Sequence, residues 1–279
     1  MNPLLEIENL RVTFPTPRGD LEVVRGLSFT LGRERLGIVG ESGSGKSMTG
    51  RSILKLVRAP GRVTADRLTF DGIDLLTRSE RQMRAIRGAR ISMVMQDPKF
   101  SLNPVMTIGE QIAEALLTHQ RLPRREVNNR VFTMLESVRI ADPERVAKLY
   151  PHEVSGGMGQ RVMIAMMLIP EPDLLIADEP TSALDVSVQA QVLDIIDELV
   201  KRKGKGMGLI FISHDLNLVS SYCDRILVMN TGEVVEECKA GELMNATHPY
   251  TRGLIASIPR LDETRNELPV LDRSAWATK

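Results

Sequence analysis

The clearest chemical pattern in this chain is a glycine-rich stretch of the kind that binds phosphate groups. Its residues are Gly40, Glu41, Ser42, Gly43, Ser44, Gly45, Lys46 and Ser47. An apolar run at 36–39 precedes it, so a buried strand would lead through this turn into a helix and direct backbone N–H groups toward one point. Lys46 can reach the β- and γ-phosphates and the Ser47 hydroxyl can bind Mg²⁺. The spacing predicts a nucleotide-binding loop.

Polar residues that can act on such a nucleotide follow three further apolar runs. Gln96 follows the run 91–95, Asp178 and Glu179 end the run 174–179, and His214 follows the run 208–213. Ligands bind at the carboxyl ends of strands in open α/β sheets. We therefore expect Gln96 to meet the same nucleotide as Lys46, Asp178 to bind Mg²⁺, Glu179 to act as a general base, and His214 to contact the γ-phosphate.

Two other positions carry weaker signals on spacing alone. Ser155, followed by Gly156 and Gly157, can cap a helix and form a second anion-binding helix start, or it can be a cap without further function. Phe14 comes just before a turn, where its ring can stack on a purine or can fill the core or a sheet edge.

The elements around these residues follow from periodicity and turn signals. Residues 5–14, 21–24 and 62–76 predict an antiparallel β layer, and residues 107–118, 124–139 and 143–148 predict an inserted helical subdomain. The remaining expected elements are a basic helical stretch at 78–90, a helix at 188–201, strands at 225–230 and 233–236, and a helical segment at 241–260 broken at His248-Pro249.

Composition sets limits on the class of protein. The chain has 279 residues, enough for one core domain with insertions, and its formal net charge is zero, which gives no global indication of nucleic acid binding. No signal-like start and no run of about 18 apolar residues is found, so we expect a cytosolic protein. Cys223 and Cys238 are expected to be reduced packing residues.

Taken together, residues 4–260 resemble the ATP-binding subunit of an ABC transporter. The resemblance is carried by the Walker A loop 40–47, the Q-loop Gln96, the signature 155–160, the Walker B run 174–179, the D-loop 182–185 and the switch His214, in family order. Phe14 stands where the family has an adenine-stacking aromatic residue, commonly Tyr. The signature departs from the common LSGGQ at Val154 and Met158.

Further motifs resemble the oligopeptide/dipeptide/nickel importer branch of this family. They are the Ser-Gly-Gly-Met signature, Gln96-Asp97-Pro98 with 101–104 after it, and the late motif 248–252. Some members of the branch carry a C-terminal cysteine cluster for an iron–sulfur centre, but only Cys238 lies near that region here, so no cluster is predicted. Peptide, nickel, metal chelate and opine-like cargo all remain open.

The resemblance implies an α/β fold: a P-loop NTPase (RecA-like) core with an antiparallel β subdomain and an inserted α-helical subdomain. The expected domains are 1–95 with 160–240 for the ATP-binding core and β subdomain, 96–159 for the helical subdomain with the Q-loop and signature, and 241–279 for a C-terminal extension.

The resemblance also implies the site and the activity, which is ATP hydrolysis with Mg²⁺. Lys46, Gln96, Glu179 and His214 are the expected catalytic residues, and Ser47, Gln96 and Asp178 the Mg²⁺ ligands. The expected ATP contacts are Phe14, the loop residues Gly40, Glu41, Ser42, Gly43, Ser44, Gly45, Lys46 and Ser47, and Ser155, Gly156, Gly157 and Asp185.

In the family, the signature residues at the positions of Ser155 and Gly157 complete the nucleotide site of the opposing subunit. We expect a second ATP-binding subunit in a heterodimer, with a homodimer as the alternative, two transmembrane permease subunits and, indirectly, an extracytoplasmic substrate-binding protein. The expected location is peripheral, on the cytoplasmic face of the inner membrane. One alternative is a soluble ABC ATPase acting on nucleic acid or ribosomes, and the other is a P-loop kinase or GTPase, in which the signature and His214 have no purpose.

Overall fold

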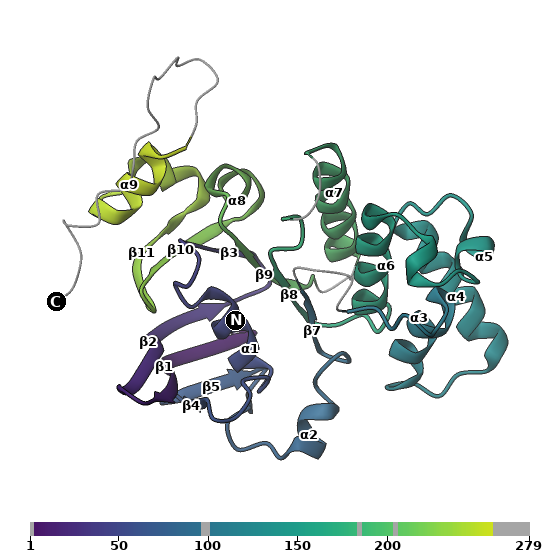
Figure 1. Cartoon of the computed structure of the whole chain (residues 1–279), viewed down its shortest axis with the longest axis horizontal. Helices are drawn as coiled ribbons and strands as arrows, with labels where there is room; N and C mark the ends of the chain where they lie inside the picture. Colours follow the sequence, from purple (N-terminus) through teal and green to yellow (C-terminus); the bar gives the residue numbers. More distant parts are fainter. Residues whose placement is uncertain (1–2, 96–100, 183–185, 203–205, 259–279) are drawn as a thin grey trace. The chain divides into compact units, whose positions relative to one another are not determined.

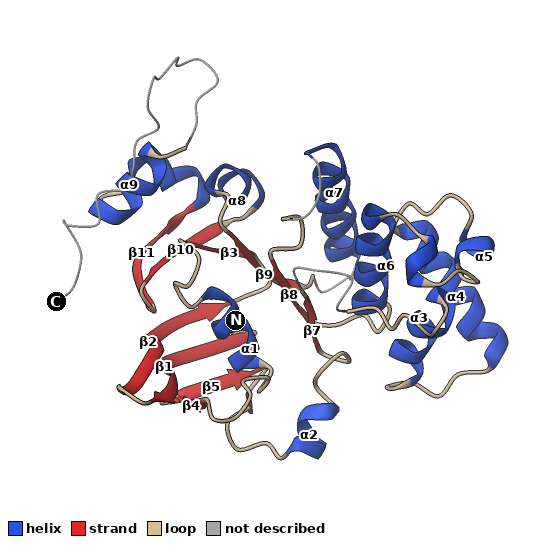
Figure 2. Cartoon of the chain, viewed as in Figure 1, coloured by secondary structure: helices blue, strands red, loops and turns tan. Residues whose placement is uncertain are grey.

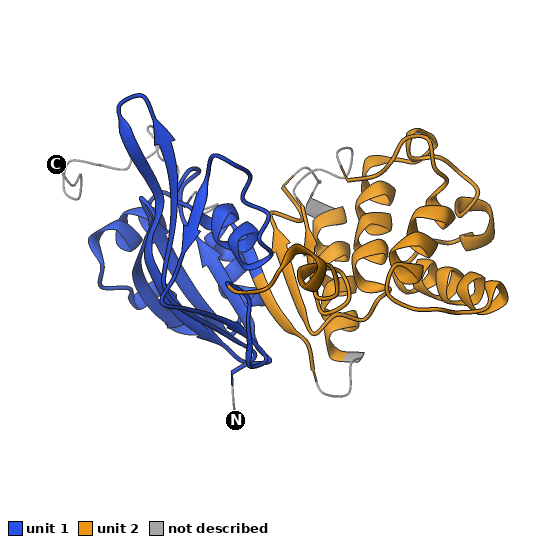
Figure 3. Ribbon diagram, turned by 90° about the horizontal axis from the view of Figure 1, so that it is seen from below, with its two compact units in different colours: residues 1–76, 211–279 blue, residues 77–210 orange. Residues whose placement is uncertain are grey.

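The computed structural model describes residues 3–95, 101–182, 186–202 and 206–258, without the side chains of 186, 187 and 202. The chain forms two compact units, which are coloured separately in Figure 3. Unit 1 contains residues 1–76 and 211–279, and unit 2 contains residues 77–210. Strand β9 (Gly208–Ser213) passes from unit 2 into unit 1. These units do not test the predicted domain boundaries, which stay a prediction.

Unit 1 contains an antiparallel sheet (Figure 2). Its strands are β1 (Leu5–Thr16), β2 (Gly19–Leu31), β4 (Arg62–Thr64), β5 (Arg67–Phe70) and β6 (Ile73–Asp74). The order is β2-β1-β5-β6, with β4 also paired to β1. The predicted antiparallel layer is confirmed, but β2 runs well past the predicted residue 24. It does so because it pairs with β1 along its length, from Phe14 opposite Leu21 to Leu5 opposite Leu31.

A second group of strands in unit 1 carries the glycine-rich loop (Figure 1). Strand β10 (Arg225–Asn230) lies parallel to β3 (Arg35–Val39) and antiparallel to β11 (Glu233–Lys239). Residues from Leu36 to Val39 are completely buried, as expected for a parallel strand covered on both faces. The helices of this unit are α1 (Lys46–Ile53), α8 (Leu216–Tyr222), the 3₁₀ helix η3 (Ala240–Asn245) and α9 (Pro249–Ala256).

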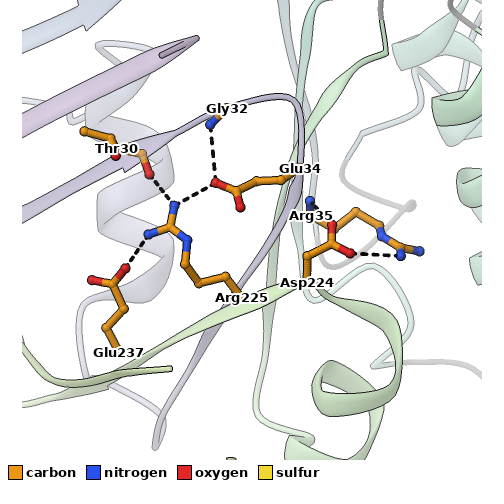
Figure 4. Close-up of polar contacts among 7 residues, drawn as sticks. All are labelled: Thr30, Gly32, Glu34, Arg35, Asp224, Arg225 and Glu237. Carbon is orange, nitrogen blue, oxygen red and sulfur yellow. Dashed lines mark hydrogen bonds and ion pairs between the residues drawn. The ribbon is translucent and has the colours of Figure 1, made fainter. Parts of the chain in front are cut away.

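Ion pairs fix the beginning of β10 (Figure 4). The Arg225 guanidinium binds Glu34 Oε1 at 2.8 Å and Glu237 Oε1 at 2.5 Å, and it donates to the Thr30 carbonyl. Next to it, Asp224 accepts a hydrogen bond from Arg35 N at 2.8 Å. These contacts therefore hold the neighbouring parts of β2, β3, β10 and β11 in fixed positions relative to one another.

Unit 2 combines two parallel strands with a group of helices. Strand β7 (Ile91–Val94) pairs with β8 (Leu174–Asp178). The helices are α2 (Glu80–Arg84), α3 (Ile108–Leu117), α4 (Arg124–Ser137), α5 (Pro143–Val146), the 3₁₀ helix η2 (Pro151–Glu153), α6 (Gly156–Leu168) and α7 (Val186–Arg202). The three helices predicted between residues 107 and 148 are confirmed. Buried Val127, Val131 and Leu135 form one stripe of α4, as its spacing predicts.

Two predictions about helices were wrong or incomplete. The basic stretch 78–90 is helical only over Glu80–Arg84, because Gly88 adopts φ of 80° and its N–H bonds the Ile91 carbonyl in a turn. Helix α8 was not predicted; it begins after Asp215, whose carboxylate caps it by accepting from Leu218 N at 3.0 Å. In the parts of the chain that the structure describes, no helix is both long and apolar enough to cross a membrane.

Candidate functional site

Two glycines of the loop are required by its backbone. Gly40 has φ of 151°, and a Cβ there would lie 2.1 Å from the Met229 carbonyl oxygen. Gly45 has φ of 100°, and its Cβ would lie 2.6 Å from the Val23 carbonyl oxygen. Both conformation and space exclude a side chain at these positions. The loop therefore packs directly on the backbone of β2 and β10.

The ammonium group of Lys46 lies inside the loop. The residue is 5% exposed, and its Nζ donates to Gly40 O at 2.7 Å and to Glu41 O at 2.8 Å. A buried ammonium must be compensated, and here backbone carbonyls do this. The positive charge is thus fixed beside the loop backbone.

The first turn of α1 has no side-chain cap. Its N-cap is Gly45, which has no side chain that could cap the helix. Ser47 is half-buried in this turn, and Thr49 N donates to Gly45 O at 2.9 Å. Backbone N–H groups and the positive end of the helix dipole therefore face the position where phosphates are predicted.

Phe14 and His214 also belong to unit 1. Phe14 is half-buried on β1, and its ring lies against Gly61, where an added Cβ would be 2.6 Å from Phe14 Cε1. His214 is exposed directly after β9, next to the cap of α8. The prediction that His214 follows a buried strand is confirmed.

The two predicted carboxylates end strand β8 in unit 2. Asp178 is 5% exposed, and Glu179 is half-buried in the left-handed region with φ of 47°. A non-glycine residue in this region costs energy and is often found at functional sites. The Glu179 carbonyl accepts from Ser182 N at 3.3 Å and from Ser182 Oγ at 3.2 Å, which holds the turn after the strand.

The predicted second helix start is formed by α6. Ser155 is its N-cap and accepts from Met158 N at 3.3 Å, which confirms the cap. Ser155 and Gly156 are exposed, and apart from the neighbouring residues and nearby backbone of α6 itself, no described atom lies within 4 Å of a Cβ placed on Gly156. A Cβ on Gly157 would lie 3.1 Å from Val188 of α7.

Gln160 connects the signature with the segment after strand β8, a role that the sequence did not predict. Gln160 is 1% exposed, and its Nε2 donates to Pro180 O, the residue after Glu179. A buried amide in the first turns of a helix could have indicated such a link, but its partner could not be read from spacing. Gln96 and Asp185 lie outside the described residues.

The cysteines behave as the sequence predicts. Cys223 is buried, and burial first, with a smaller contribution from Asp224, raises the pKa of its thiol to about 12 despite Arg35. It is therefore protonated at neutral pH and suits packing. Within the described ranges, no group of three or more His, Cys, Asp or Glu side chains gathers in a way that could hold a metal ion. The absence of an iron–sulfur centre stays a prediction.

A strand, a glycine-rich loop with a buried lysine and a helix, together with a buried strand that ends in two carboxylates, define a P-loop nucleoside triphosphatase. The family model for ABC transporters matches residues 24–182. The chain belongs to the ABC transporter family, and its part in that family is that of the ATP-binding subunit.

Its relatives include ATP-binding subunits of peptide transporters. The oligopeptide transport ATP-binding protein OppD of Salmonella typhimurium is 46% identical over 269 residues, which cover 96% of this chain and 79% of that protein. The dipeptide transport ATP-binding protein DppD of Bacillus subtilis is 46% identical over 275 residues, covering 98% of this chain and 82% of that protein.

Solved structures of ATP-binding cassettes share the fold. The cassette MJ0796 in a dimeric post-hydrolysis state with ADP and Pi has a TM-score of 0.75 and 27% identity, covering 85% of this chain and 98% of that one. The cassette cbiO1 of Clostridium perfringens has a TM-score of 0.74 and 25% identity, covering 88% and 92%. The predicted fold class is confirmed.

Proposed function

We propose that this chain is the ATP-hydrolysing subunit of an importer for peptides. The observation that carries this proposal is the 46% identity over almost the whole chain with subunits named for oligopeptide and dipeptide transport. The loop of unit 1 supplies the physical basis, since it holds a buried lysine at a helix start that has no side-chain cap. The alternative of an ATPase acting on nucleic acid or ribosomes has no such support.

Unit 1 is proposed to bind the nucleotide. Lys46 and the N–H groups of the loop and of the first turn of α1 face the phosphates, and the Phe14 ring faces the base. His214, exposed after β9, is proposed to hydrogen-bond the γ-phosphate. These residues bind and orient.

Mg²⁺ fits the oxygen donors that the chain offers. Ser47 contributes a hydroxyl and Asp178 a buried carboxylate, and both are hard ligands of the kind this ion prefers. We propose these two residues as protein ligands, together with Gln96. The ion would neutralise charge on the phosphates.

Glu179 is proposed as the general base. Its carboxylate can accept a proton from the attacking water, and its half-buried position keeps it accessible to water. The left-handed conformation at Glu179 turns the chain immediately after Asp178, and we propose that the two adjacent carboxylates have different roles. One can then hold the metal while the other moves a proton.

The signature residues are proposed to serve a second ATP-binding subunit. Ser155 and Gly156 are exposed at the start of α6, where backbone N–H groups can meet a phosphate of a nucleotide that another chain binds. Asp185 is also proposed to contact the nucleotide. The partner is proposed to be a different chain, and two permease subunits are proposed to hold the pair at the cytoplasmic face of the inner membrane.

Peptides are the proposed cargo because the relatives are named for them. The test is uptake by cells in which the chromosomal copy of this chain carries Glu179→Gln. We expect uptake of a radiolabelled tripeptide to fall to background and uptake of nickel to stay unchanged, with full recovery by a wild-type copy. Loss of nickel uptake with normal peptide uptake would contradict the proposed cargo.

A further inference from the structure

The hydroxyl group of a buried tyrosine contacts the backbone of the glycine-rich loop. Tyr250 in α9 has an exposed fraction of 0%, and its Oη accepts a hydrogen bond from Glu41 N at 3.1 Å. The two residues are 209 positions apart in the chain, and both belong to unit 1. The second residue of the loop is therefore held by a side chain from the C-terminal part of the protein.

The peptide group between Gly40 and Glu41 is held at both of its polar ends. Its N–H donates to Tyr250 Oη, and its carbonyl oxygen accepts from Lys46 Nζ at 2.7 Å. A trans peptide is planar and its N–H and C=O point in opposite directions, so these two bonds fix the rotation of the whole group. Lys46 also donates to Glu41 O of the following peptide group at 2.8 Å, so the ammonium group is held by two consecutive carbonyls, the first of which belongs to the peptide that Tyr250 binds.

Strand β11 fixes the beginning of α9 through Glu236. Its Oε1 accepts from Thr247 N at 2.7 Å and from His248 N at 3.3 Å, and His248 Nδ1 accepts from Tyr250 N at 3.2 Å. The first turn of α9 thus has capping partners that set the position of Tyr250. Tyr250, Thr251 and Leu254 form the buried face of the helix.

The charge of Glu236 supports this arrangement. Burial acts to raise the pKa of its carboxyl, but the Thr251 hydroxyl and the backbone N–H groups of Thr247 and His248 together lower it below the ordinary value. Glu236 Oε2 and Thr251 Oγ1 are buried, and among the described residues neither has a well-formed hydrogen bond, so the bonds from the backbone N–H groups of Thr247 and His248 carry this contact. The carboxylate stays ionised at neutral pH and accepts from the helix start.

We propose that Tyr250 is a positioning residue for ATP binding, whose hydroxyl holds the Gly40–Glu41 peptide in the orientation that places Lys46 for the phosphates. This inference rests on the proposed role of residues 40–47 as the phosphate-binding loop. Tyr250 acts through the loop backbone and does not itself contact the nucleotide. Its contribution is preorganisation, which raises affinity by reducing the cost of ordering the loop.

The test compares two tyrosines from which the same atom is removed. Tyr250→Phe keeps the ring and loses Oη, so the dissociation constant of ATP with Mg²⁺, measured calorimetrically on the full chain at 25 °C, should rise about three- to tenfold, as for the loss of one hydrogen bond. The control is Tyr222→Phe, also in unit 1, whose ring packs 5.2 Å from that of Phe211. It should change the constant less than twofold. An equally small change in Tyr250→Phe overturns the proposal.

Two further measurements keep the outcome clear. If Tyr250 were merely structural, Tyr250→Phe would lower the melting temperature but leave the ATP affinity of the folded protein unchanged. In the wild-type chain, hydrogen exchange of the Glu41 amide should be slow without nucleotide, and exchange at the rate of a free peptide would contradict the proposal even if the variant did not fold. Normal ATP binding by Lys46→Ala would instead contradict the loop assignment, and this inference with it.

Discussion

The glycine-rich loop of unit 1 and the start of α6 in unit 2 differ in how completely the chain itself surrounds them. The loop lies against backbone carbonyls of Val23 and Met229, its lysine is 5% exposed, and a distant tyrosine holds its second peptide group. Ser155 and Gly156 are exposed, and a Cβ on Gly156 would meet no described atom within 4 Å apart from its chain neighbours and the nearby backbone of α6. One glycine-rich helix start is enclosed by its own chain, and the other is open.

The difference between the enclosed loop and the open start of α6 agrees with the different tasks proposed for the two units. An enclosed loop is preorganised, so it can bind a nucleotide with little ordering of its own residues. An open helix start has N–H groups available for a ligand that another chain brings. The segment that follows the carboxylates of β8 is joined to α6, since Gln160 of α6 donates to the carbonyl of Pro180. We therefore expect variants in unit 1 to change binding and variants in unit 2 to change turnover.

The largest effect is expected at Glu179. Glu179→Gln keeps the size and shape of the side chain but removes the base, so hydrolysis should fall about 10²- to 10⁴-fold while ATP binding persists. The measurement is steady-state phosphate release with a parallel binding titration.

Glu171→Gln is the matched control for this variant. Glu171 also has a left-handed conformation, with φ of 60° against 47° at Glu179, and also precedes a proline. Its substitution should change the rate less than twofold. Near-normal turnover of Glu179→Gln would contradict the role of Glu179 as the general base.

A pair of glycine variants tests the contrast between enclosed and open directly. Gly40→Ala must fit a Cβ 2.1 Å from Met229 O at φ of 151°, so the free energy of unfolding should fall by about 3 kcal/mol. Gly156→Ala has free space at its Cβ and should change it by less than about 0.5 kcal/mol. Urea unfolding of both proteins gives the comparison. Equal losses of unfolding free energy in the two variants would show that the two helix starts are equally enclosed.

Lys46→Ala should weaken ATP binding about 10- to 100-fold, the usual range for losing a hydrogen bond from a charged group. Lys55→Ala is the control, because Lys55 lies in the same unit and also donates to a backbone carbonyl, Leu76 O at 2.7 Å. Calorimetric titration with ATP should give a normal constant for Lys55→Ala. Unchanged affinity in Lys46→Ala would count against the loop.

Local spacing predicted the loop, the strand ends and most helices, because each depends on residues that are close in sequence. The glycines at 40 and 45 and the cap Ser155 are of this kind. The hydrogen bond between Tyr250 and Glu41 could not be predicted, because 209 positions separate the two residues and neither segment carries a sequence signal for a contact with the other. The length of α2 could not be predicted either, because the spacing of the basic residues does not show that Gly88 adopts a left-handed φ of 80°.

The measurement that tests the shared site most directly is a mixed assay of this chain with its partner ATPase subunit. One nucleotide site at a time is blocked by the Glu→Gln change in its own chain, and Ser155→Arg is then introduced here. If the start of α6 completes the partner's site, hydrolysis should be lost where the partner's site is the active one and kept where Lys46 and Glu179 of this chain are active. Loss only at this chain's own site would contradict the account.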